Sequence, residues 1–106
     1  MSIERLDKGR RMSEAVIHGN TVYLAGQVAE GPDVESQTRA VLASIDSLLA
    51  RAGTDKSRIL TATIWLSDIG NFAGMNSVWD AWVDQENPPA RACVQSLGFD
   101  KYRTAQ

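Results

Sequence analysis

The apolar residues of the chain follow two kinds of repeat, and their order predicts seven elements. Residues 15–18 and 21–25 are rich in strand-forming residues and flank Gly19-Asn20, a pair that tolerates positive φ. This arrangement predicts a hairpin of two strands, preceded by a weaker strand near Ile3.

Two later stretches carry apolar residues at spacings of three and four, which is typical of a helix with one buried face. Asp33 can cap the first helix, and Gly53 is a natural stop. Asn71 is the expected cap of the second helix, and Pro88-Pro89 excludes further helix. The expected buried residues are Val41, Leu42, Ile45, Leu48, Leu49 and Ala52 in the first helix, and Phe72, Met75, Trp79, Trp82 and Val83 in the second.

Residues 59–66 predict a central strand and residues 90–94 a last one. The order β-β-β-α-β-α-β predicts one α+β domain over 1–106, a mixed sheet with two helices on one face. Alternate residues of the central strand are expected under the helices, and the others are apolar enough to need cover from another copy of the chain. The first set is Leu60, Ala62, Ile64 and Leu66, and the second is Ile59, Thr61, Thr63 and Trp65.

Composition narrows the function classes. A chain of 106 residues with net charge −2 fits one small domain and has no general attraction for nucleic acid or acidic membranes. The basic residues Arg5, Lys8, Arg10 and Arg11 predict a solvated entry segment rather than a phosphate-binding arm. No apolar run approaches the ~20 residues of a membrane span. With one cysteine and no signal peptide at the start, we expect a cytoplasmic protein.

Arg91 is the strongest candidate for chemistry. It follows the proline pair and shares a strand face with Cys93 and Gln95. A guanidinium there needs an anion or several acceptors, and its planar fork matches a carboxylate. The structural alternative is an ion pair with Asp84 or Glu86, or solvation at a strand edge.

Other chemistry has weaker support. Cys93 is expected to be a small buried hydrophobe, because a nucleophilic thiol needs an activating base. His18, the only histidine, lies in a hairpin strand and is expected at a surface or interface. No metal-ligand spacing, phosphate-binding loop or cofactor motif is present, so we expect neither metal nor cofactor.

The chain resembles the RidA/YjgF family, the reactive-intermediate deaminases, over roughly residues 14–95. The resemblance is specific because several segments occur in the family's order, and the second and third are most similar to the YoaB branch. The segments are Ala15 to Val28, Asp55 to Leu60, Phe72 to Trp82, and Pro89 to Val94.

The resemblance implies a chorismate-mutase-like fold and a homotrimer with three clefts between subunits. It implies that Arg91 holds the carboxylate of a small imino or enamino acid, which is hydrolysed to a 2-keto acid and ammonia. Backbone groups near Cys93 would place the substrate or the water, and Asn76 and Trp79 would lie near or support the cleft. Ala25 and Gly26 complete the implied binding positions, although the family often has serine where Ala25 stands.

Two further departures bear on catalysis. Met12-Ser13 stands where the family often has an aromatic residue. After Lys101-Tyr102-Arg103 the family continues into a strand with a water-positioning glutamate, whereas the sequence here ends in Thr104-Ala105-Gln106. The final strand and its acid are therefore expected to be missing.

Three functions remain open from the sequence. The first is hydrolytic deamination of reactive enamine and imine intermediates of amino-acid metabolism, with Arg91 orienting the carboxylate. The second is a non-catalytic trimer that binds small carboxylates. The third is the endoribonuclease activity attributed to parts of the family, against which the net charge of −2 argues.

Overall fold

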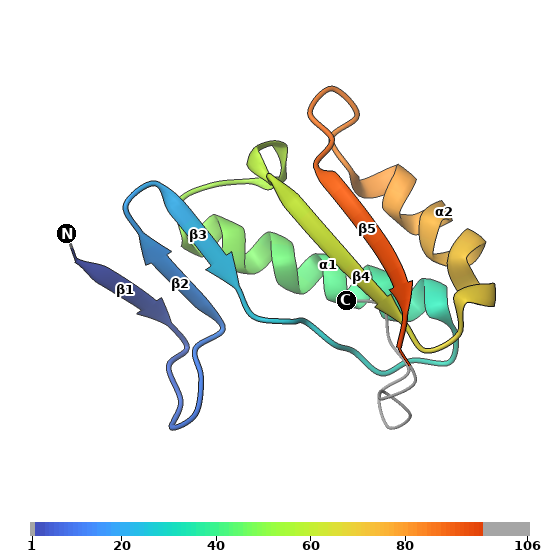
Figure 1. The fold of residues 1–106 in the computed structure, drawn as a ribbon, viewed down its shortest axis with the longest axis horizontal. Coiled ribbons are helices and arrows are strands. Elements are labelled where there is room, and N and C mark those ends of the chain that lie inside the picture. The colour runs from blue at the N-terminus through green and yellow to red at the C-terminus, as the bar shows by residue number, and fades with distance from the viewer. Residues whose placement is uncertain (1, 97–106) are drawn as a thin grey trace.

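A computed structural model describes residues 2–96, and the C-terminal departure at 97–106 lies outside these residues. Its elements follow the predicted order (Figure 1). The strands are β1 (Ile3–Leu6), β2 (Ala15–His18), β3 (Thr21–Leu24), β4 (Thr61–Leu66) and β5 (Ala90–Gln95). The helices are α1 (Val34–Arg51) and α2 (Phe72–Trp82), with short 3₁₀ turns η1 (Lys56–Arg58) and η2 (Ile69–Asn71).

The strands of the described residues form two sheets rather than one continuous mixed sheet. β1, β2 and β3 are antiparallel neighbours in that order, and β4 pairs with β5 in parallel. Helix α1 runs behind both sheets, and α2 lies beside β5 (Figure 1). Together the two helices cover one face, as the sequence predicts.

Single residues close to the ends of the helices and strands determine where several of these elements begin and end. Gly19 takes φ 62° in the turn that joins β2 to β3, where His18 pairs with Thr21. Asp33 caps α1, because its Oδ1 accepts a bond of 2.7 Å from the backbone N–H of Ser36. Gly53 ends α1 at φ 85°, a left-handed conformation that glycine adopts without steric cost.

Asn71 stands at the N-cap position of α2, as predicted, but the expected capping bond is absent. Asn71 makes no side-chain bond to the helix, and the turn η2 precedes it directly. Asp68 caps that turn instead, since its Oδ1 accepts a bond of 2.8 Å from the N–H of Gly70. The chain therefore enters α2 through a 3₁₀ turn, an arrangement that is frequent at helix termini.

The core lies between the β4–β5 sheet and the two helices. Leu42, Ile64, Leu66, Met75, Val78 and Trp79 form its buried cluster. Leu60 departs from the prediction: it precedes β4, which begins at Thr61, and its side chain is 76% exposed. Phe72 also departs, with 40% exposure, whereas Val78 is buried although the spacing did not indicate it.

Helices α1 and α2 approach closely at Gly74. A Cβ placed on Gly74 would lie 2.8 Å from Cγ1 of Val34 and 3.2 Å from Cδ of Glu35. Atoms at these separations overlap, so only glycine allows this contact between α2 and the first turn of α1. The contact fixes α2, and with it the residues that α2 presents to β5.

Candidate functional site

Arg91 lies on β5 and its guanidinium reaches α2. Its Nη1 donates a hydrogen bond of 2.7 Å to Oδ1 of Asn76. Arg91 is exposed and Asn76 is half-buried. One N–H group of the Arg91 guanidinium is therefore bound by the protein. Because Arg91 is exposed, its other N–H groups remain available to a ligand.

Two aromatic rings accompany this bond. Cζ of Arg91 lies 5.2 Å from the ring centroid of Trp79 and 5.8 Å from that of Phe72. Both distances are within the range in which a cation is attracted to a ring face. Phe72, Asn76 and Trp79 occupy helix positions i, i+4 and i+7, so α2 presents one continuous face to the guanidinium.

The predicted alternative of an ion pair for Arg91 is wrong within residues 2–96. The salt bridge found there joins Arg51 to Asp7 over 2.8 Å. Asp84 instead accepts bonds from the backbone N–H of Glu86 and the side-chain amide of Asn87. Asn76 is a neutral partner, so the positive charge of Arg91 is not cancelled by the groups that orient it.

Cys93 lies two residues beyond Arg91 on the face of β5 that packs against the core. Burial raises the pKa of its thiol, and the nearby positive charge of Arg91 opposes this rise. A thiol in this state is a poor nucleophile near neutral pH. His18 lies in β2, where it pairs with residues of β1 and β3, so the structure brings together no Cys/His pair.

The structure brings Arg91, Asn76 and Trp79 together but places Ala25 and Gly26 elsewhere. These two residues follow β3 and line a groove between β3 and β4; Trp79 also lines this groove, whereas Arg91 and Asn76 do not. Phe72 is a further contact of Arg91 that was not predicted from the sequence. Its i, i+4, i+7 spacing with Asn76 and Trp79 was available as a signal, but it was interpreted as core.

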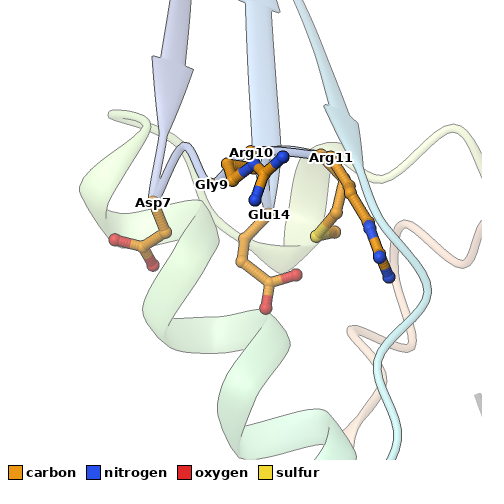
Figure 2. A pocket seen from close by; sticks show the side chains of 6 residues that line it. Asp7, Gly9, Arg10, Arg11 and Glu14 are labelled. Carbon is orange, nitrogen blue, oxygen red and sulfur yellow. The ribbon is translucent and has the colours of Figure 1, made fainter.

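A separate hollow lies in the connection between β1 and β2 (Figure 2). Arg10 and Arg11 line it together with two acidic residues, Asp7 and Glu14. Asp7 is also bound to both terminal nitrogens of Arg51 at 2.8 Å. The acidic side chains offset the two arginines, which are exposed, in agreement with a solvated entry segment.

Comparison with known proteins identifies the family. The model of the family described as Endoribonuclease L-PSP matches residues 2–101. The chain belongs to this family. Similar curated proteins belong to the RidA/YjgF group. The RutC family protein YoaB of Escherichia coli strain K12 is 47% identical to this chain over 106 residues, which cover 97% of this chain and 92% of the relative. A RutC family protein of Haemophilus influenzae is 46% identical over 105 residues, covering 96% and 90%.

A solved structure confirms the RidA/YjgF fold. A member of the YjgF protein family from Neisseria meningitidis superimposes with a TM-score of 0.90 at 44% identity, covering 97% of this chain and 88% of that one. Yeast Mmf1 shares the fold at 20% identity and a TM-score of 0.89. The YoaB-like assignment from the sequence is confirmed.

Among residues 2–96, no three His, Cys, Asp or Glu side chains gather closely enough to hold a metal ion. No helix in this part of the chain is both long and apolar enough to cross a membrane.

Proposed function

We propose that the protein hydrolyses small 2-imino acids and their enamine tautomers, and that Arg91 binds the substrate carboxylate. The observation that supports this most directly is the guanidinium bound to a neutral amide, Asn76, at 2.7 Å. An arginine that is oriented without being neutralised is suited to a planar anion, which it can bind through two parallel hydrogen bonds.

The reaction needs little from the protein beyond positioning. Water adds to the C=N carbon, a proton moves to nitrogen, and the C–N bond breaks to release ammonia and the 2-keto acid. Imines hydrolyse unaided in water, so holding the carboxylate and the attacking water in one geometry accelerates an already accessible step. Arg91 anchors the substrate, and Phe72 and Trp79 limit the positions that the guanidinium can adopt.

The complete site is proposed to lie between copies of the chain in a homotrimer. Support comes from the open face of the β4–β5 sheet, where Trp65 and Val94 are 39% and 37% exposed, and from Tyr23 on β3, which is 61% exposed. Ala25 and Gly26 follow β3, which belongs to the other sheet, and they line a groove that does not include Arg91, so a neighbouring copy is the proposed source of these two residues in each cleft. Native mass spectrometry tests the assembly: three copies support it, and a monomer contradicts it.

The activity is tested by ammonia release. An amino-acid oxidase generates 2-iminopropanoate or 2-iminobutanoate, and the decay of the imine is followed with wild type, Arg91→Ala and Arg39→Ala. Arg39 is an exposed cation on α1 and serves as the matched control. We expect acceleration by wild type and Arg39→Ala but not by Arg91→Ala. Equal rates for wild type and Arg91→Ala contradict the proposal.

A non-catalytic carboxylate-binding module is the second candidate. The observation that favours it is that, within residues 2–96, no carboxylate or imidazole forms a hydrogen bond or ion pair with Arg91, so no group beside the guanidinium is placed to act as a general base. Titration with 2-oxobutanoate alongside the imine assay separates the two candidates. Binding without accelerated ammonia release supports the module, and release with binding supports the enzyme.

A further inference from the structure

The helix face that contacts Arg91 extends by one residue into the turn η2. Ile69 of η2 stands three residues before Phe72, seven before Asn76 and ten before Trp79. Spacings of three and four keep residues on one face of a helix or 3₁₀ turn. Arg91 contacts the last three members of this row. The row therefore continues beyond the proposed carboxylate site, and Ile69 is its outer member.

A side-chain bond from β5 fixes the position of Ile69. Oε1 of Gln95 accepts a hydrogen bond of 2.8 Å from the backbone N–H of Ile69. Gln95 lies on the same face of β5 as Arg91, four residues further along the strand. One strand is thus tied to α2 through Arg91 and to η2 through Gln95, at two points about 13 Å apart along β5. Phe72 lies between these two points on the helix side.

Beside Arg91, the exposed apolar surface of this row lies towards η2. Phe72 and Ile69 are 40% and 45% exposed, whereas Trp79 is 8% exposed and belongs to the buried core. A ligand whose carboxylate is bound by Arg91 therefore has apolar surface to cover at Phe72 and Ile69, but almost none at Trp79. Phe72 and Asn76 are separated by about 6 Å along the axis of α2. A ligand side chain of a few carbons covers this distance.

The charged groups at the two ends of this surface have opposite signs. Arg91 is the cation at one end, and Asp68 directly precedes Ile69 at the other. Oδ1 of Asp68 accepts a bond of 2.8 Å from the backbone N–H of Gly70, which holds the carboxylate in this turn. A second anionic group on the ligand would be placed on apolar carbon near that carboxylate, where desolvation and like charge both disfavour it. An uncharged side chain meets neither penalty.

We infer that Phe72 and Ile69 select the side chain of the substrate, and that the site favours 2-imino acids with branched aliphatic side chains over short or acidic ones. This inference rests on the proposed binding of the substrate carboxylate by Arg91. Each CH₂ group that is removed from water strengthens binding by a factor of about four. A short substrate such as 2-iminopropanoate reaches Arg91 without covering Phe72, so it lacks this contribution. Phe72 and Ile69 are thus specificity-determining residues.

Three 2-keto acids, which keep the carboxylate and replace C=NH by C=O, test this preference without requiring turnover. In calorimetric titrations of the full chain, 4-methyl-2-oxopentanoate is expected to bind about 10-fold more tightly than 2-oxobutanoate. We expect 2-oxoglutarate to bind more weakly than either. If 2-oxobutanoate binds and 4-methyl-2-oxopentanoate binds no more tightly, or 2-oxoglutarate binds best, the inference is overturned and the role of Arg91 stands. If none of the three binds, the role of Arg91 is overturned and the inference with it.

Variants assign the preference to its residues. Phe72→Ala removes the exposed ring, and we expect the affinity ratio of 4-methyl-2-oxopentanoate to 2-oxobutanoate to fall from about 10 to about 2. Ile69→Thr keeps the branched shape and the backbone N–H that bonds to Gln95, and we expect the ratio to fall about two- to fourfold. Ile3→Ala is the matched control, because Ile3 is 50% exposed on β1, at the other end of the molecule from α2 (Figure 1). A ratio that is unchanged in both site variants, or that falls equally in Ile3→Ala, overturns the inference.

Discussion

Arg91 donates a hydrogen bond of 2.7 Å to Oδ1 of Asn76, which joins the last described strand to the middle of α2. The bond links an exposed cation to a half-buried neutral side chain. It orients the guanidinium without reducing its charge. The proposed carboxylate binding depends on this difference between an oriented cation and a paired one.

Asn76 is the direct test of that difference. Asn76→Ala removes the acceptor, and we expect carboxylate affinity to fall several-fold because the guanidinium gains rotamers that do not fit the ligand. Asn76→Asp replaces the amide with a competing carboxylate, and we expect a larger loss, of about 10- to 100-fold. Calorimetric titration with 2-oxobutanoate measures both. Ser77→Ala, on the exposed side of the same helix, is the control, and a weaker effect from Asp than from Ala contradicts the interpretation.

Cys93 is expected to react slowly with alkylating reagents. Burial raises the pKa of its thiol, and the charge of Arg91 lowers it to a lesser extent. The rate of reaction with iodoacetamide, followed against pH by mass spectrometry, should have its midpoint above the ordinary value of about 8.5. Arg91→Ala should move the midpoint higher still. A midpoint below the ordinary value would show an activated thiol, in conflict with a structural role for Cys93.

Gly74→Ala is expected to destabilise the protein although alanine favours helices. The helix propensity gains about 1 kcal/mol, but a Cβ that lies 2.8 Å from Val34 forces the helices apart at a cost of about 1–3 kcal/mol. Thermal unfolding should therefore show a lower Tm. Asp80→Ala provides a control at an exposed position of the same helix, and we expect an unchanged or slightly higher Tm. An increase in Tm for Gly74→Ala would contradict the close contact.

Asp7 should contribute stability that depends on pH. The bond to Arg51 holds the pKa of the Asp7 carboxyl below its usual value, so the folded state binds its proton less readily than the unfolded state. The contribution is present above the unfolded pKa of about 3.9 and is lost as the pH falls through the lower folded value. Asp7→Asn should lower Tm at pH 7, and the difference should vanish at low pH. Asp80→Asn serves as the exposed control, and a difference that does not change with pH would contradict the ion pair.

Short-range signals allowed much of the fold to be predicted. Asp33 caps α1 and Gly53 ends it because each depends on backbone groups within a few residues of itself. The Gly19-Asn20 turn is local in the same way. The buried face of α1 also follows from its spacing, since Val41, Leu42, Leu48 and Leu49 are all buried.

Long-range contacts explain what the sequence did not reveal. Phe72 fits the apolar spacing of α2, but β5 places a cation beside it, and its ring stays exposed. Leu60 alternates correctly with Ala62, yet β4 begins only at Thr61, so its side chain faces solvent. The separation of Ala25 and Gly26 from Arg91 depends on which strands become neighbours, and strand alternation does not encode that order.

The central claim is that Arg91 binds a carboxylate, and calorimetric titration of 2-oxobutanoate into wild type, Arg91→Ala and Arg39→Ala tests it most directly. We predict saturable binding to wild type and Arg39→Ala, weakened by about 10- to 100-fold in Arg91→Ala through the loss of charge-assisted hydrogen bonds. Equal affinity of the wild type and the Arg91→Ala variant for this ligand would contradict the account.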